Sequence, residues 1–153
     1  MINIPDQTSF FPEKGMKKKG GKRKKKEESL QLFLAKYMQM KYPNVIFQSD
    51  IASGMRLTIG QAIKAKHMRS GRGQPDLIIM EPCGKYHALC IELKNQISDV
   101  YLKDGITISD AKSSDHVREQ SEMLKRLCDK NYFAVFGFGR DHCMKIIDDY
   151  MSL

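Results

Sequence analysis

Apolar residues along this chain recur with two different spacings, and each spacing predicts one type of element. Where they recur every three or four positions, we expect amphipathic helices. Pro43 helps to end the first of these helices. Ile59, Ile63 and Met68 suggest a short helix whose polar side is basic. The stretches with helical spacing are residues 27–42, 55–75, 114–130 and 141–151.

Short continuous apolar runs, bounded by residues that break regular structure, predict strands instead. The runs at residues 77–80 and 88–93 are too short for free-standing helices, and Pro82 and Gly84 lie between them. We therefore expect these two runs to pair as a hairpin. The other strand candidates are residues 45–51 and 132–138.

Taken in order, the expected elements are helix, strand, short helix, hairpin, helix, strand and helix. This order predicts an α/β fold, in which a mixed central sheet is flanked by helices on both faces. A polar stretch at residues 95–114 interrupts the order. Its Asp104-Gly105 step lies between two short apolar runs, which predicts a small β-hairpin insertion.

Charged residues stand in the expected hairpin where a strand normally carries apolar ones. Asp76 follows Pro75 at the start of the first strand, while Glu92 and Lys94 are two residues apart in the second. That spacing projects Glu92 and Lys94 from the same face of the strand. Two carboxylates about 4 Å apart repel by about 1 kcal/mol in water and several-fold more near a protein surface, and a divalent cation is the usual remedy. The hairpin is therefore the first candidate for a functional site.

These residues also carry a resemblance to a known family. Pro75-Asp76, followed after the hairpin by Glu92-Leu93-Lys94, resembles the PD-(D/E)XK nuclease signature. Within that superfamily, residues 73–79, the second strand and the downstream His116 and Gln120 resemble the virus-type replication-repair nuclease (VRR-NUC) family. The resemblance implies a restriction-endonuclease-like core and an endonuclease that hydrolyses phosphodiester bonds in DNA. It makes branched or junction DNA the candidate substrate, in phage or bacterial replication or repair.

The resemblance spans roughly residues 27–151 and implies Mg²⁺ or Mn²⁺ as the cofactor. It also places a glutamate on the first helix four residues before a glutamine, which matches Glu27 and Gln31. At about 100° per residue, Glu27 falls on the inward side of that helix and Glu28 points further away, although Glu28 remains the alternative. The metal ligands implied in this way are Glu27, Asp76, Glu92 and the backbone carbonyl of Leu93.

The resemblance also implies catalytic roles for the residues around the metal. Lys94 would orient or help to deprotonate the attacking water, and would offset charge in the transition state. Gln120 would position the water or a phosphate oxygen, and His116 is a weaker candidate for the same area. The implied catalytic residues are Asp76, Glu92, Lys94 and Gln120.

Most of the positive charge belongs to one end of the chain. The net charge is +8, and residues 1–26 hold nine Lys/Arg residues against Asp6 and Glu13, which gives this arm +7 and leaves about +1 for residues 27–153. We interpret residues 1–26 as a flexible arm that binds phosphate backbones non-specifically, or that only aids solubility, and residues 27–153 as the nuclease domain.

A second basic stretch immediately precedes the acidic hairpin. Residues 55–75 contain several cations and no acid, so this strip is suited to hold DNA phosphates beside the carboxylates. A solvated helix face would have the same composition. Gly71 and Gly73 at its end would let the backbone lie close to a ligand. The cations of the strip are Arg56, Lys64, Lys66, Arg69 and Arg72.

Composition limits the cellular compartment, the cofactors and the partners that we expect. No apolar run approaches membrane-spanning length, no secretory signal begins the chain, and the four cysteines lack zinc spacing. We expect DNA as the partner, no membrane and no organic cofactor, in the cytoplasm of a bacterial or phage-infected cell, or in the nucleus of a eukaryotic host. Family members resemble junction-resolving enzymes, which act as symmetric dimers, so a homodimer is also expected. The alternatives are a catalytically silent nucleic-acid-binding module and an interaction subunit of a repair or packaging complex.

Overall fold

A four-stranded sheet forms the centre of the protein in the computed structural model, which describes residues 23–50, 58–102, 105, 108 and 115–153, and the side chains of all of these except residues 23–28 and Lys66. The strands lie in the order β1-β2-β3-β4. The pairs β1–β2 and β2–β3 are antiparallel, whereas β3–β4 is parallel, which confirms the expected hairpin and mixed sheet. The strands are β1 (Phe47–Ser49), β2 (Leu77–Ile79), β3 (Leu89–Lys94) and β4 (Phe133–Phe138).

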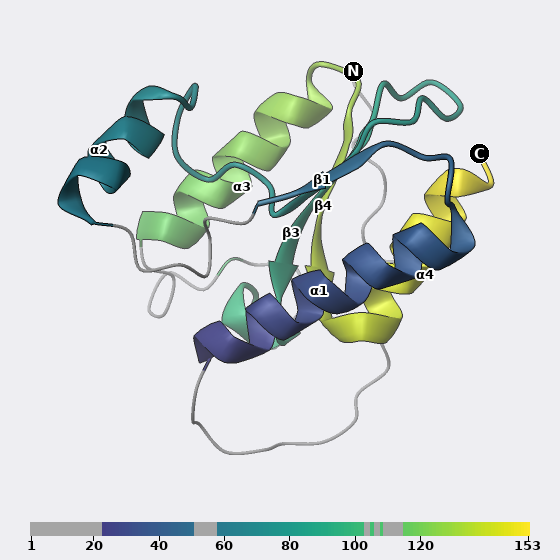
Figure 1. Ribbon diagram of the computed structural model, residues 1–153, viewed down its shortest axis with the longest axis horizontal. Coiled ribbons are helices and arrows are strands. Elements are labelled where there is room, and N and C mark those ends of the chain that lie inside the picture. The colour runs from purple at the N-terminus through teal and green to yellow at the C-terminus, as the bar shows by residue number, and fades with distance from the viewer. Residues whose placement is uncertain (1–22, 51–57, 103–104, 106–107, 109–114) are drawn as a thin grey trace.

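Helices cover both faces of this sheet, as the α/β prediction requires. α1 (Arg23–Lys41) and α4 (Gly139–Met151) lie side by side on one face, and α3 (Asp115–Cys128) covers the other (Figure 1). α2 (Ile59–His67) projects at one end of the molecule, beside α3 and on the left of the view. A short 3-10 turn, η3 (Ile97–Asp99), follows β3. In the described part of the chain, no helix is long and apolar enough to cross a membrane.

The sheet separates two hydrophobic cores. β3 contributes side chains to both, because successive side chains of a strand point to opposite faces. Ile91 and Leu93 pack into the core beneath α1 and α4. Cys90 points the other way, into the core beneath α3. By the same alternation, Glu92 and Lys94 face α3, although both are buried and a buried strand position normally carries an apolar residue.

The boundaries of several elements differ from the sequence prediction. α1 begins at Arg23 rather than Glu27, so the end of the expected arm is helical, while residues 1–22 lie outside the described residues. In the insertion, Tyr101 and Ile108 form an antiparallel bridge, but Asp104 at its expected turn is also outside the described residues. The base of the insertion belongs to the fold, because Val100 is fully buried in the core beneath α3.

Asp148 of α4 links that helix to α1 through hydrogen bonds and an ion pair. Its Oδ1 accepts hydrogen bonds from the hydroxyls of Tyr37 at 2.5 Å and Tyr42 at 2.8 Å, and its Oδ2 lies 2.7 Å from Lys41 Nζ. Burial raises the pKa of this carboxyl, but the hydrogen bonds from Lys41, Tyr37 and Tyr42 outweigh burial and leave the pKa below its usual value. The folded state therefore favours the ionised form of Asp148.

Asp148→Asn is expected to lower the free energy of unfolding by about 1 kcal/mol, since it weakens hydrogen bonds to a charged acceptor that is partly exposed. Urea unfolding at pH 7 measures this change. Asp149→Asn is the matched control, because Asp149 pairs only with the exposed Lys145 among the ion pairs of the described residues. An equal loss in both variants would contradict the role assigned to Asp148.

Candidate functional site

Asp76 and Glu92 lie opposite each other across β2 and β3. The antiparallel register pairs Leu77 with Ile91, so the next positions to face each other are Asp76 and Glu92. Asp76 Oδ2 accepts a hydrogen bond from the backbone N–H of Leu93 at 2.9 Å. The two carboxyl groups are close enough for each to alter the pKa of the other. The hairpin therefore forms the carboxylate pair that its sequence predicts.

Two further buried side chains contact Glu92. Lys94 Nζ donates a hydrogen bond to Glu92 Oε1 at 2.9 Å, and Gln120 Nε2 of α3 donates to the same oxygen. Glu92 is 2% exposed, Gln120 4% and Lys94 8%. The fold thus brings together the four residues that the sequence predicted to be catalytic. We call Asp76, Glu92, Lys94 and Gln120 the carboxylate cluster.

Burial dominates the electrostatics of the cluster. It raises the pKa of Glu92, and the adjacent charge of Asp76 adds to the rise, so that the pKa reaches about 8 although Lys94 acts in the opposite direction. Burial also raises the pKa of Asp76, against the lowering effect of the Leu93 N–H and of Lys94. Near pH 7 and without metal, the pair therefore binds a proton, which belongs mainly to Glu92.

Two buried oxygen atoms of the cluster are left without a hydrogen bond from any described residue. They are Glu92 Oε2 and Gln120 Oε1. Leaving a buried acceptor unsatisfied costs about 1–3 kcal/mol, so a bound cation or its water would stabilise both atoms. Oxygen atoms are the ligands that Mg²⁺ and Mn²⁺ prefer. The residues present therefore fit the metal that the family resemblance implied.

The third carboxylate expected for this metal belongs to the first turns of α1. The side chains of Glu27 and Glu28 lie outside the described residues, although both residues belong to α1. Among the side chains that are described, no group of three or more His, Cys, Asp or Glu residues could hold a metal ion. The described oxygen donors at the cluster are thus Asp76, Glu92 and the backbone beside them.

Gln31 of α1 and Asp50, which follows β1, also contact Asp76. The sequence assigned neither of them a catalytic or metal-binding role. Gln31 Nε2 lies 3.3 Å from Asp76 Oδ1 and 3.4 Å from the carbonyl oxygen of Asp50. The backbone N–H of Asp50 donates to the carbonyl oxygen of Asp76 at 2.8 Å. The sequence did contain a signal for Gln31, since the family resemblance places a glutamine at this position, four residues after Glu27. No such signal marked Asp50.

Gly73 brings the loop before β2 against α3. Its φ is +75°, and a Cβ atom built there would lie 2.7 Å from the carbonyl oxygen of Glu119 and 2.8 Å from the Cα of Gln120. The sequence predicted that Gly71 and Gly73 would approach a ligand, but the close neighbour of Gly73 is the backbone of α3. Gly73 therefore helps to set the position of Gln120.

Gly73→Ala is expected to lower the free energy of unfolding by about 2–3 kcal/mol, because it combines a strained φ with a clash against backbone. Urea unfolding gives the loss, and the amide NMR signal of Gln120 should shift. Gly105→Ala is the matched control, since Gly105 has a φ of +73° and a Cβ there meets no atom within 4 Å in the described structure. Equal losses in both variants would show that the contact with α3 contributes nothing.

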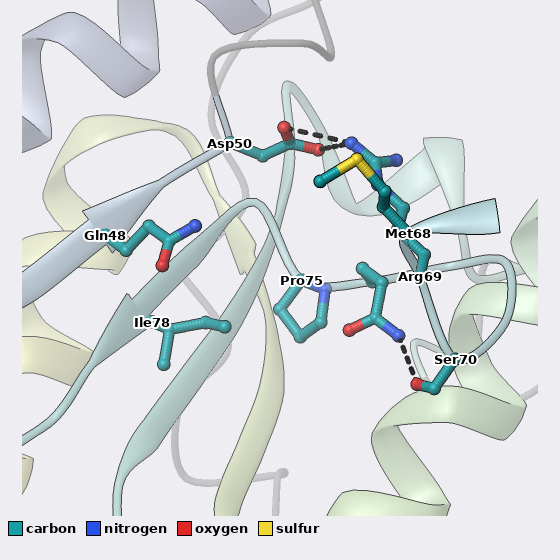
Figure 2. A pocket seen from close by; sticks show the side chains of 8 residues that line it. Gln48, Asp50, Met68, Arg69, Ser70, Pro75 and Ile78 are labelled. Atoms are coloured by element: carbon teal, nitrogen blue, oxygen red, sulfur yellow. Dashed lines mark hydrogen bonds and ion pairs between the residues drawn. The ribbon is translucent and has the colours of Figure 1, made fainter. Parts of the chain in front are cut away.

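Cations of the basic strip form ion pairs with acidic residues from other parts of the chain. Arg69 donates to both carboxylate oxygens of Asp50, at 2.9 and 3.1 Å. Figure 2 shows this ion pair beside a pocket of about 320 Å³, which Pro75 and Ile78 line from the side of β2. Met68 at the end of α2 lines the pocket as well. Arg69 therefore links the loop after α2 to β1, next to Asp76.

The other cations of the strip differ in their surroundings. Arg72 forms an ion pair with Glu119 of α3 at 3.2 Å. Lys64 is exposed on α2, whereas Arg56 and the side chain of Lys66 lie outside the described residues. The strip thus presents Lys64 directly to solvent, whereas Arg69 and Arg72 are ion-paired with Asp50 and Glu119.

A groove of about 620 Å³ runs between α2 and α3. Ala62 and Ala65 line it on one side, and His116 lines it on the other. His116 Nε2 lies 3.1 Å from Gln120 Nε2, so the imidazole nitrogen accepts from the amide that also binds Glu92. The groove therefore leads to the carboxylate cluster through His116, which the family resemblance had placed in this area.

Comparison with solved structures found a similar fold. No family model matches the chain, and no curated protein matches it. A solved structure described as "VRR_NUC domain protein" matches with a TM-score of 0.58 and 23% identity, over 82% of this chain and 88% of that chain. The chain has a VRR_NUC fold. At this identity the likeness concerns the VRR_NUC fold alone, and it confirms the fold that the family resemblance predicted.

Proposed function

We propose that this protein is a Mg²⁺- or Mn²⁺-dependent DNA endonuclease of the PD-(D/E)XK type. The observation that carries the proposal is the pairing of half-buried Asp76 with buried Glu92, with Lys94 on the same strand face as Glu92. This arrangement does not favour the sheet, since two facing carboxyl groups at a buried position must either repel each other or hold a proton. The likeness to a VRR_NUC domain protein supports a nuclease.

The metal ligands in this proposal are the carboxylates of Asp76, Glu92 and Glu27 and the backbone carbonyl of Leu93. Glu92 Oε2, which accepts no hydrogen bond from the described residues, is the free oxygen of the set. When bound, such an ion lowers the pKa of a water ligand and polarises the scissile phosphate.

The chain's own residues supply the remaining chemistry. Lys94 uses one of its three N–H donors on Glu92, which leaves two to hold the attacking water or a phosphate oxygen. Its positive charge offsets the negative charge that develops in the transition state. Gln120 offers Oε1 to orient the same water, while its amide nitrogen is held by Glu92 and His116. Burial of these groups strengthens each interaction, because little water competes.

DNA binding in this proposal uses the basic strip and the N-terminal arm. Lys64, Arg69 and Arg72 would contact phosphates near the cut, whereas residues 1–26 would bind the backbone elsewhere without sequence preference. Phosphate contacts of this kind position the duplex but do not read its sequence. Arg69 and Arg72 would exchange their carboxylate partners for phosphate oxygens.

A cleavage assay tests the proposed function. The purified full-length protein is incubated with linear, nicked, flapped and four-way-junction DNA in Mg²⁺, in Mn²⁺ or in EDTA. Cleavage is expected with either metal and not in EDTA, and Asp76→Ala should abolish it. Glu122→Ala is the matched control, because Glu122 is an exposed carboxylate on α3. Cutting that persists in EDTA or in Asp76→Ala would overturn the mechanism, and binding without any cutting would indicate a silent nucleic-acid-binding module.

A further inference from the structure

Helix α2 leaves its largest apolar side chains in solvent. Ile59 is 82% exposed, Ile63 is 53% exposed, and Met68 directly after the helix is 77% exposed. Ile59 and Ile63 are four residues apart, so helix geometry places them on the same side. Figure 1 shows that α2 projects beside α3 instead of lying against the sheet. The apolar residues that suggested this helix therefore do not form a core face.

Hydrogen bonds at both ends of α2 support the helix, although Ile59 and Ile63 are not packed. Thr58 Oγ1 accepts a hydrogen bond from the N–H of Gln61, and Gln61 Oε1 accepts one from the N–H of Thr58. This reciprocal cap satisfies backbone donors at the start of the helix. At the other end, the N–H of Met68 donates to the carbonyl oxygen of Lys64. α2 thus presents Ile59 and Ile63 on a helix that is already capped at both ends.

The charge around α2 restricts the kind of partner that fits. Residues 51–75 contain no Asp or Glu, and Lys64 and His67 are exposed on α2 beside the isoleucines. A surface that is both apolar and basic is complementary to a ligand with apolar faces and negative charge. DNA offers both where base pairing is interrupted, because the face of a base is then open beside the phosphates. In a continuous duplex the same faces are covered by stacking.

The position of α2 connects it to the carboxylate cluster. Arg69, just after the helix, binds Asp50, whose backbone N–H donates to Asp76. A few residues later, Gly73 lies against Gln120. The groove between α2 and α3 also leads to the cluster through His116. DNA held in the cluster must therefore pass close to α2.

We propose that α2 is a wedge for branched DNA, in which Ile59 and Ile63 pack against the open base pair at a fork or flap. This inference rests on the proposed function for the path of the DNA, and it assigns the recognition of branched DNA to two residues of α2. Ile and Met are among the apolar side chains that proteins insert at base steps, and such insertion stabilises an unstacked conformation. The wedge would favour branched substrates without reading their sequence.

Base-analogue fluorescence tests the wedge apart from cleavage. Forked DNA and continuous duplex each carry 2-aminopurine, at the branch point or at the same sequence position, and both are titrated with full-length protein in EDTA. The fluorescence should rise only with the fork, and the fork should bind about tenfold more tightly than the duplex. Ile59→Ser combined with Ile63→Ser should abolish the rise and reduce the preference to about twofold or less.

Two further variants test whether the effect depends on apolar side chains at positions 59 and 63. Ile59→Met combined with Ile63→Met keeps the apolar side chains and should retain both the fluorescence rise and the preference. Ile46→Ser removes an isoleucine that is 68% exposed next to β1, and it should also retain both. Thermal melting of each variant checks that the fold is intact.

Two outcomes would overturn the wedge. One is a serine variant that keeps both the fork preference and the fluorescence rise. The other is analytical ultracentrifugation showing that the wild type dimerises and the serine variant does not, which would make a second copy of the chain the partner of α2. A wild type that fails to cut DNA in Mg²⁺ would overturn the proposed function only, because both wedge measurements are made without metal.

Discussion

Lys94→Met is expected to lower kcat for DNA cleavage by about a thousandfold while changing KM little, because it removes a charge that acts mainly in the transition state. The variant should fold. Glu92 already carries a proton near pH 7, so methionine leaves no unpaired charge beneath α3. Steady-state cleavage of flapped DNA in Mg²⁺, with circular dichroism to confirm folding, measures the effect.

Lys85→Met is the matched control for this prediction. Lys85 belongs to the same hairpin but lies exposed in its turn, over the ring of Tyr86. Its loss should leave kcat within about twofold of the wild type, since it makes no contact with the carboxylate cluster among the described residues. If Lys94→Met retained wild-type kcat, Lys94 would be only a structural partner of Glu92.

Without metal, the protein is expected to lose stability steadily as the pH rises from about 4.5 to about 8. The pKa of Glu92 is raised from 4.5 to about 8, so across this interval the folded state binds more protons than the unfolded state. The free energy of unfolding then falls with rising pH, by up to about 5 kcal/mol at 1.36 kcal/mol per pKa unit. Urea unfolding in EDTA at a series of pH values measures this slope.

The Glu92→Gln variant tests whether Glu92 causes this pH dependence of the free energy of unfolding. The amide imitates the protonated carboxyl and cannot ionise, so the slope should become shallower and the variant should be more stable than the wild type at pH 8. Saturating Mg²⁺ should stabilise the wild type more at pH 8 than at pH 5, because metal and proton compete for Glu92. The variant should cut DNA at least a hundredfold more slowly. A wild-type slope unchanged by Glu92→Gln would contradict the assignment.

The sequence predicted the parts of the site that lie on regular elements. Alternation along β3 places Glu92 and Lys94 on one face, and the hairpin brings Asp76 opposite Glu92, so local geometry is sufficient to form this group. Gln120 was found through the family resemblance and not through spacing, because nothing in a helical pattern shows which strand the helix covers. The fold then buried Gln120 against Glu92.

The sequence could not predict contacts made between distant segments. The strip at residues 55–75 contains no acid, yet the fold brings Asp50 to Arg69 and Glu119 to Arg72. Apolar spacing also predicted α2 correctly as a helix, but periodicity shows only that one side is apolar and not that anything covers it. Tertiary packing decided both outcomes.

The weak packing of α2 has a consequence for local unfolding. A helix that buries little apolar surface contributes little to the global free energy of folding, so α2 can open while the sheet and its two cores remain intact. Its amide protons should then exchange with solvent far faster than those of β3 and β4. The proposed wedge can thus adjust its conformation separately, while the carboxylate cluster stays within the slowly exchanging core.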